Sequence, residues 1–373
     1  MKVIDLFSGC GGLSLGFIQN GFKIVKAVEF DSSIANTYKK NHPEIEILVD
    51  DIRNIDNCNN FNKGDADIVI GGPPCQGFSM AGARIRDGFI DDDRNYLFKH
   101  FFNIVRTVKP KIFIMENVKG LMTMQGGKTF DEICNIFSDE NLMNGTKYHI
   151  YHKVLKAVDL GIPQKRERLF IIGIRDTSIE FELKLKGTTQ RIINKHPTFF
   201  DPVTVYDAIC NMPTVTNNGD VANPVPVSAY QKYLATREAT LSNHIKTNHS
   251  KVAVERMQKI ANGDNFTSLD EDIKSVHSGS YGRLRWDDVA PTITTRFDTP
   301  TGGRFIHPVE HRTLTPREAA RIQSFPDDFI FYGNKTSVCK QIGNAVPPKM
   351  SYFWANFVET LVTDADKIST KLI

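Results

Sequence analysis

Cys75, Glu116 and Arg168 are the residues whose types and positions best suit chemistry on a bound substrate. Cys75 lies in the segment "GGPPCQGFS", which directly follows the apolar run "ADIVI". The two prolines before Cys75 stiffen the chain and aim the thiol as a nucleophile. Glu116 in "MENV" also ends an apolar run and is a candidate acid. Arg168 in "QKRERLFIIG" adjoins a buried strand and needs an anionic or carbonyl-rich partner. A thiol is reactive only if its pKa is lowered, so an inert Cys75 is the alternative.

The segment "DLFSGCGGLSLGF" places Gly9, Gly11 and Gly12 between a predicted strand and a predicted helix. The backbone can approach a ligand closely there, and the N–H groups of the helix face it. Glu29 ends the next predicted strand and can accept hydrogen bonds from ribose hydroxyls, which indicates a nucleoside-bearing cofactor. Ser14 replaces the third glycine of the dinucleotide fingerprint, which disfavours a nicotinamide cofactor. A tight turn without a ligand is the alternative.

Two further segments adjoin the same predicted sheet edge. Asp50 and Asp51 follow the third predicted strand, and one of them could hold an adenine amino group, although either alone also fits a solvated loop acid. Residues 77–95 are rich in Gly, Arg and Asp, which is typical of a loop that closes over a substrate. Arg84, Arg86 and Arg94 in this loop are candidates for phosphate contacts.

The order of apolar runs predicts the fold. Over about the first 175 residues, short β-rich runs alternate with stretches of helical spacing, which indicates a doubly wound α/β domain with a mostly parallel sheet covered on both faces. From about residue 181 this alternation is lost, which predicts a second, smaller and less regular domain. The predicted strands are 2–7, 24–30, 44–49, 66–71, 111–117 and 168–174.

The composition excludes some classes of protein. Lys plus Arg number 46 against 43 Asp plus Glu, a net charge of +3, so any nucleic-acid affinity must come from local basic clusters. The six cysteines lie far apart without a C-x-x-C pair, so we expect neither a disulfide framework nor a metal site. No apolar run approaches the roughly 20 residues that span a bilayer, and we expect a cytoplasmic protein.

Together these motifs resemble those of the DNA (cytosine-5) methyltransferase family. The matching segments span residues 5–348 and leave mainly 181–280 unmatched. They read "DLFSGCGGLSLGF", "VEFD", "DDI", "GGPPCQGFS", "DRNYLF", "MENV", "QKRERLFIIG", "RTLTPREAARIQSFP" and "QIGNAVPP".

The resemblance implies a Rossmann-like methyltransferase fold and S-adenosylmethionine as the cofactor. In such enzymes the glycines meet the methionine end, Glu29 the ribose and Asp51 the adenine amino group, with Phe7 and Ile52 beside the adenine. Asp50 stands where the family often has glycine. The residues expected in the cofactor site are Phe7, Gly9, Gly11, Gly12, Glu29, Asp51, Ile52, Pro73, Leu97 and Asn344.

The resemblance also implies a covalent mechanism. Addition of the Cys75 thiolate to C6 of cytosine makes C5 nucleophilic, while Glu116 protonates or hydrogen-bonds N3 and Arg168 binds O2. Arg166 meets a phosphate or orients its loop. The target cytosine must leave the duplex stack before the thiol can reach C6. The base that removes the C5 proton stays open.

The resemblance implies that the chain divides into three segments that belong to two domains. Residues 1–180 form the catalytic and cofactor-binding domain, 181–333 the target-recognition domain, and 334–373 return to the catalytic domain. Segments 242–260 and 280–297 mix basic, polar and aromatic residues, as DNA contacts require. In the motif near residue 315 we expect Arg312, Glu318 and Arg321 to hold the two domains together. Expected DNA contacts are Gln76, Ser79, Arg84, Arg94, Arg283, Arg285 and Arg296.

The expected partner is duplex DNA, with a separately encoded restriction endonuclease as a possible companion and a monomer as the oligomeric state. One alternative is an RNA (tRNA) cytosine-5 methyltransferase on the same fold, although the Cys-Phe-Thr tripeptide of that branch is absent from the recognition region. The other is a DNA-binding protein without activity. The presence of Cys75, Glu116 and Arg168 together argues against it.

Overall fold

A computed structural model describes residues 1–55, 60–74, 96–215, 220–236, 240–271, 273 and 278–370, the side chains of 96 and 363–370 excepted. The chain forms a seven-stranded sheet in the order β3-β2-β1-β4-β5-β7-β6. Strands β1 to β5 pair in parallel, and β7 joins β5 and β6 antiparallel, so the predicted doubly wound, mostly parallel sheet is confirmed. The strands are β1 (Lys2–Leu6), β2 (Lys23–Glu29), β3 (Glu46–Val49), β4 (Ile68–Gly71), β5 (Ile112–Val118), β6 (Tyr148–Lys156) and β7 (Glu167–Arg175).

Strand β6 was not predicted from the sequence. Its segment "YHIYHKVLK" contains no continuous apolar run, because it lies at the edge of the sheet and most of its side chains are only partly buried. An edge strand pairs with one neighbour only and can expose one of its faces to solvent. Its sequence therefore has fewer apolar residues in a row than that of a central strand.

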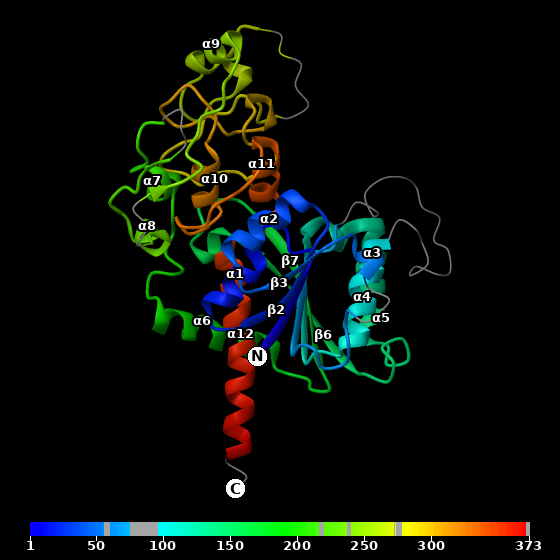
Figure 1. Ribbon diagram of the computed structural model, residues 1–373. Coiled ribbons are helices and arrows are strands. Elements are labelled where there is room, and N and C mark those ends of the chain that lie inside the picture. The colour runs from blue at the N-terminus through cyan, green and yellow to red at the C-terminus, as the bar shows by residue number, and fades with distance from the viewer. Residues whose placement is uncertain are drawn as a thin grey trace.

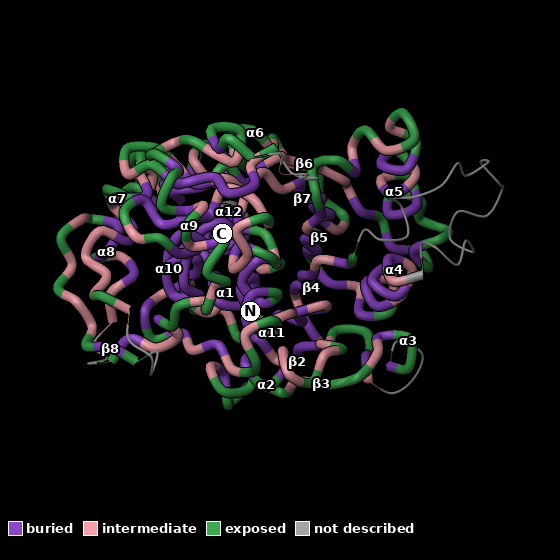
Figure 2. Tube along the Cα trace, turned by 90° about the horizontal axis from the view of Figure 1, so that it is seen from above, coloured by how far each residue is buried: buried purple, intermediate pink, exposed green. Residues whose placement is uncertain are grey.

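Helices cover both faces of the sheet (Figure 1). Successive residues of a strand point to opposite faces, so Val3 of β1 packs in one hydrophobic cluster and Ile4 in the other. Figure 2 shows β4, β5 and β7 between these helical layers. The first cluster takes in α1 (Gly12–Gln19), α2 (Ser32–Asn41), α6 (Phe181–Lys195) and α12 (Pro348–Thr370); the second takes in α3 (Ile52–Ile55), α4 (Tyr96–Val108) and α5 (Lys128–Ser138).

The second unit lies above the carboxyl edge of the sheet in Figure 1 and has little regular structure. The α/β pattern extends one helix beyond the expected change at residue 181, because Leu185 and Ile192 of α6 pack in the same cluster as the sheet and α12. The elements of this part are α7 (Val205–Ile209), β8 (Val221–Ala222), α8 (Ala229–Leu234), β9 (Thr240–Leu241), α9 (Lys251–Lys259) and α10 (Pro316–Ile322). Helix α11 (Lys335–Asn344) follows them and leads back to the first unit, where Ser337 lies 2.9 Å from Ser33 of α2.

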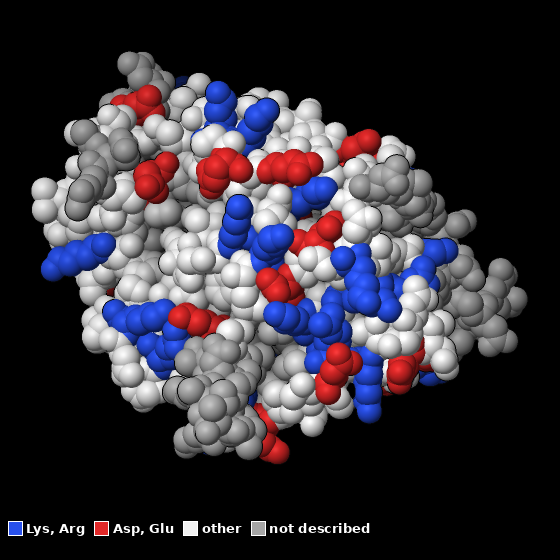
Figure 3. All heavy atoms as spheres, turned by 60° about the horizontal axis from the view of Figure 1, so that its bottom comes forward, with Lys and Arg blue, Asp and Glu red and all other residues white. Residues whose placement is uncertain are grey.

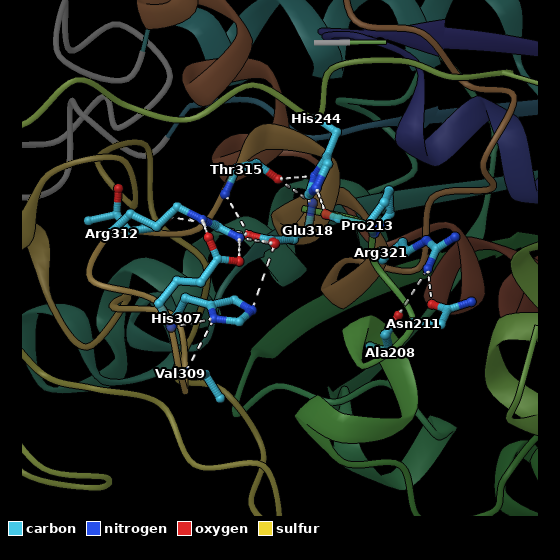
Figure 4. A network of polar contacts seen from close by, with 12 residues as sticks. Ala208, Asn211, Pro213, His244, His307, Val309, Arg312, Thr315, Glu318 and Arg321 are labelled. Atoms are coloured by element: carbon cyan, nitrogen blue, oxygen red, sulfur yellow. Dashed lines mark hydrogen bonds and ion pairs between the residues drawn. The ribbon is translucent and has the colours of Figure 1, made fainter. Parts of the chain in front are cut away.

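A buried ion pair organises the start of α10 (Figure 4). Thr315 caps this helix and Glu318 closes the capping box. The carboxylate of Glu318 is fully buried and accepts hydrogen bonds from Arg312 Nη1 and Nη2 at 2.8 and 2.7 Å. Burial alone would raise the pKa of Glu318, but the adjacent Arg312 guanidinium lowers it to about 2.

These charged residues connect segments of the second unit rather than joining it to the sheet. Arg321 pairs with Asp327 at 2.8 Å and donates to Asn211 at 2.8 Å. Other residues make bonds between the two units: Gln164, just before β7, donates through Nε2 to Ile322 O and Gln323 Oε1 at 3.1 and 2.7 Å, and Thr37 of α2 donates to Tyr332 O at 3.1 Å. The expectation that Arg312, Glu318 and Arg321 hold the two domains together is therefore wrong.

The surface carries charges of both signs. Figure 3 turns the lower face of Figure 1 forward and shows Lys and Arg side chains interspersed with Asp and Glu. Within the described parts of the chain, no helix combines the length and the apolarity that crossing a bilayer requires.

We expect Glu318→Gln to lower the free energy of unfolding at neutral pH by about 3 kcal/mol, because it removes one partner of a buried ion pair. The stabilisation by Glu318 is present above its unfolded pKa and disappears as the pH falls towards 2, so the variant should lose less stability on acidification. Urea unfolding across the acidic range measures both effects. Glu255→Gln is the control, since its pair with Lys251 is exposed and should change stability by less than about 0.5 kcal/mol. Equal losses in the two variants would contradict the assignment.

Candidate active site

A cavity of about 790 Å³ opens at the carboxyl edge of the sheet. The ends of β1 to β5 form its floor, and α11 contributes its far wall. Ligands of open α/β sheets bind at this edge, and the volume falls within the usual range for small-molecule sites.

The glycine-rich turn after β1 has a left-handed backbone. Phe7, Gly9 and Gly11 have φ of 57°, 56° and 100°. Glu29 fixes this turn to the end of β2, since its Oε2 accepts a hydrogen bond from Gly9 N at 2.9 Å and its Oε1 accepts one from Asp31 N at 2.9 Å. Burial raises the pKa of Glu29. Phe7 is strained in this region because it has a Cβ, and such strain is concentrated at functional sites.

A buried hydrogen-bond chain supports the same turn from below. The hydroxyl of Ser14 donates to Asp5 Oδ2 at 2.6 Å and lies 2.7 Å from the Tyr38 hydroxyl, so it connects β1, α1 and α2. Burial raises the pKa of Asp5 to about 7. Sequence patterns did not identify this series of hydrogen bonds, because its residues are separated in the sequence and look like ordinary strand and helix residues.

The return segment of the chain lies directly against the glycine-rich turn. The thiol of Cys10 lies 3.7 Å from the carbonyl oxygen of Gln341. A Cβ on Gly12 would lie 2.4 Å from Val346 O, closer than any real contact, so only glycine fits. Asn344 also lines the cavity, so that residues more than 300 positions apart share one wall.

The adenine side of the expected site contains an ion pair. Asp51 Oδ1 accepts hydrogen bonds from Arg53 N and Nε at 3.0 and 2.8 Å. The hydrogen bond from the Arg53 side chain lowers the pKa of Asp51, which keeps it an ionised acceptor. Ile52 begins α3 beside them, buried and lining the cavity.

A carboxyl and a guanidinium meet at the other end of the cavity. Because β5 and β7 are antiparallel with Val118 opposite Arg168, the side chains of Glu116 and Arg168 are diagonal neighbours, and Arg168 Nε lies 2.8 Å from Glu116 Oε1. Burial raises the pKa of Glu116, although the Arg168 and Arg166 charges oppose the shift. A carboxyl with a raised pKa can hold a proton near neutral pH.

The chain before Cys75 is fixed to the same place. β4 pairs in parallel with β5, with Gly71 opposite Met115. Asn117 Nδ2 donates to Pro73 O at 3.2 Å, and a Cβ on Gly72 would lie 2.9 Å from Glu116 Oε2. The segment that leads to Cys75 therefore packs on the Glu116 carboxylate.

Most of the predicted cofactor residues line the cavity, including Pro73 and Leu97. Gly11 does not line the cavity; it is the N-cap residue of α1, where its φ is positive. Phe30 was missed, although an aromatic residue directly after Glu29 was a visible signal; it lines the cavity and is 70% exposed. The predicted residues Cys75, Gln76, Ser79, Arg84, Arg86 and Arg94 lie outside the described residues.

Two predicted site residues bind backbone carbonyls. Arg166, assigned to a phosphate or to its loop, is 1% exposed and donates to Ile293 O, Gly343 O and Ala345 O at 2.9 to 3.2 Å. It therefore orients its own loop against the return segment, the second of its two expected roles, and does not line the cavity. Arg283, assigned to DNA, is 3% exposed and donates to backbone carbonyls such as Met257 O at 2.6 Å, so the expected DNA contact is wrong.

Two other arginines remain at the surface. The Arg285 side chain is 54% exposed and pairs with Asp287 at 2.7 Å, and the Arg296 side chain is 69% exposed. Their DNA contacts stay a prediction. Among the described residues, no group of His, Cys, Asp and Glu is arranged to hold a metal ion.

A mostly parallel sheet with helices on both faces, and a cavity that joins a glycine-rich turn to a carboxyl–guanidinium pair, define the class of Rossmann-like methyltransferases. The family profile described as "C-5 cytosine-specific DNA methylase" matches residues 1–358. The chain therefore belongs to the C-5 cytosine-specific DNA methylase family, which confirms the family and the enzyme class that its motifs predicted.

Individual relatives agree with this assignment. Type II methyltransferase M1.HphI of Haemophilus parahaemolyticus is 36% identical over 98% of this chain and 88% of its own length. Type II methyltransferase M.DdeI of Desulfomicrobium norvegicum is 32% identical over 94% of this chain and 86% of its own. A crystal structure described as a DNA modification methyltransferase encoded within a prophage (E. coli) superimposes with a TM-score of 0.72 at 30% identity, covering 97% of this chain and 99% of that one.

We expect Gly12→Ala to weaken the binding of S-adenosylhomocysteine by at least about tenfold, because the added methyl group would push the return segment away from the glycine-rich turn. Isothermal titration measures the affinity. Gly120→Ala is the matched control, since a Cβ there meets nothing within 4 Å and should leave binding unchanged. Unaltered binding in Gly12→Ala would show that this close contact does not shape the cavity.

Proposed function

We propose that the protein transfers a methyl group from S-adenosylmethionine to C5 of a cytosine flipped out of a specific duplex DNA sequence, through a transient bond between Cys75 and C6. The observation that carries this proposal is the Glu116–Arg168 pair, which packs on the segment leading to Cys75 inside the cavity that begins at the glycine-rich turn.

The residues of the cavity fit the proposed cofactor. Glu29 and Asp51 offer carboxylate oxygens to a ribose and to an adenine amino group, and Phe30 lines the same cavity. The glycine-rich turn leaves room for the amino-acid end, since a Cβ on Gly9 would meet nothing within 4 Å. The bound cofactor supplies a methyl group activated by its attachment to a sulfonium.

Cys75 carries the covalent step in this proposal. Its thiolate adds to C6, the electrons of the C5–C6 double bond move so that C5 becomes nucleophilic, and C5 takes the methyl group. Loss of the C5 proton then allows elimination of the Cys75 thiolate and restores the aromatic ring. Pro73 and Pro74 stiffen the approach to Cys75, and the Asn117 bond to Pro73 O fixes where that approach begins.

Glu116 and Arg168 stabilise the ring during this addition. The addition to C6 places negative charge on N3 and O2 of the pyrimidine. A Glu116 carboxyl with a raised pKa can donate its proton to N3, and Arg168, held 2.8 Å from Glu116 Oε1, can receive O2. The direction of this pKa shift favours the protonated form that an acid needs.

The part of the chain above the sheet is proposed to recognise the DNA. Since α6 packs with the sheet, we place the recognition domain between about residue 200 and residue 333, with 334–373 returning to the catalytic domain. Arg285 and Arg296 are its candidate DNA contacts, because both side chains are exposed. The family to which the chain belongs is described as a C-5 cytosine-specific DNA methylase, so the RNA alternative is not favoured.

The relatives also support a biological setting. Both curated relatives named above are Type II methyltransferases, so we propose that this protein protects the sites of a separately encoded restriction endonuclease and acts as a monomer.

We expect DNA that carries 5-fluorocytosine at the target site to become covalently attached to Cys75, because fluorine at C5 prevents the final elimination. A denaturing gel and mass spectrometry of the adducted peptide measure this product. Cys75→Ser should abolish both the adduct and methyl transfer, whereas Cys134→Ser, a change on α5, should form the adduct normally. Adduct formation by Cys75→Ser would overturn the mechanism. An adduct on tRNA in preference to duplex DNA would instead change the substrate.

We expect Glu116→Gln to lower kcat by about 10²-fold or more, because an amide cannot transfer a proton to N3. The wild-type rate should fall as the pH rises through the raised pKa of Glu116, since the acid form is then lost, and this falling limb should be absent in the variant. Initial rates from mildly acidic to mildly alkaline pH measure both effects. Glu167→Gln, which changes a partly exposed acid paired with Lys119, should preserve rate and profile. A wild-type profile without the falling limb would contradict the acid role.

A further inference from the structure

Lys340 presents a cation to the cavity from α11. It is exposed, and it makes no hydrogen bond or ion pair with any residue in the described part of the chain. It lies one helical turn before Asn344, which lines the same cavity, so both side chains project from one face of α11.

The other basic residues that line the cavity are already paired. Arg53 binds Asp51, and Arg168 binds Glu116 at 2.8 Å. At the glycine-rich turn, the Glu29 carboxylate is held by the N–H groups of Gly9 and Asp31, not by a cation. Lys340 is therefore the lining cation whose charge is balanced by no described residue, and a ligand with an anionic group would balance it.

The position of α11 indicates which end of a ligand Lys340 meets. The residue after it, Gln341, is the one whose carbonyl oxygen lies 3.7 Å from the Cys10 thiol of the glycine-rich turn. Ser337, on the preceding turn of α11, lies 2.9 Å from Ser33 at the start of α2. Lys340 thus lies on the part of α11 that packs against the glycine-rich turn and α2.

We propose that Lys340 binds the carboxylate of the amino-acid portion of the cofactor. The inference rests on the proposed function, under which the cofactor carries this carboxylate near the glycine-rich turn. The N–H groups at the start of α1 and the Lys340 ammonium approach it from two sides, so the carboxylate receives both backbone donors and a full counter-charge. Lys340 is thereby a binding residue that favours cofactors with an intact amino-acid end.

The test compares two ligands by isothermal titration: S-adenosylhomocysteine and its decarboxylated analogue, which keeps the amine and loses the carboxylate. Lys340→Met should weaken the first by about tenfold and change the second by less than about twofold, while Lys340→Arg should retain most of the affinity. Lys40→Met, which removes an exposed charge from α2 outside the cavity, is the matched control and should change neither.

Three outcomes overturn the inference. The first is that Lys340→Met weakens the binding of both ligands equally, and the second is that it leaves the binding of S-adenosylhomocysteine unchanged. The third is that it weakens the binding of duplex DNA while the affinity for the cofactor stays intact, which would make Lys340 a phosphate contact. The proposed function fails separately, if the wild-type protein itself does not bind S-adenosylhomocysteine. Wild-type binding with no effect of Lys340→Met refutes only the role of Lys340.

Discussion

The pairing of β4, β5 and β7 at the centre of the sheet is the constraint on which the site depends. Parallel pairing brings the ends of β4 and β5 to one edge, and antiparallel pairing returns the start of β7 to the same edge. The Glu116 carboxylate then has room only because Gly72 has no side chain, and it meets Arg168 at 2.8 Å. A one-residue slip in either register would turn one of these side chains to the other face of the sheet.

The cofactor wall depends on contacts between distant parts of the chain. Gly12 accepts the backbone of Val346 at a distance that excludes any Cβ, and Arg166 donates to the carbonyl oxygens of Gly343 and Ala345. The cavity is therefore complete only when the return segment has docked on α1. Such long-range closure links cofactor affinity to the stability of the whole fold.

Buried arginines give the irregular second unit of the molecule its order. Arg317 is fully buried and donates to Ser242 O, Pro326 O and Phe329 O, and Arg283 binds carbonyl oxygens in the same way. Irregular segments leave many carbonyl groups without secondary-structure partners, and a guanidinium with five N–H donors satisfies several at once. These arginines therefore replace the hydrogen bonds that a larger sheet would have made.

By itself the sequence determined the α/β class, the positions of six of the seven sheet strands, and the family, because apolar runs and spaced motifs are local features. It predicted Glu116, Arg168 and Glu29 as site residues, since each follows or precedes a buried strand. Only the tertiary structure decided that Arg166 and Arg283 bind backbone carbonyls, and that Gly11 caps α1 and does not line the cavity. It also decided that β6 is an edge strand of the sheet and that Lys340 lines the cavity. The reason is that an arginine or lysine looks the same in sequence whether it meets phosphate, carboxylate or backbone, and its partner is set by residues far along the chain.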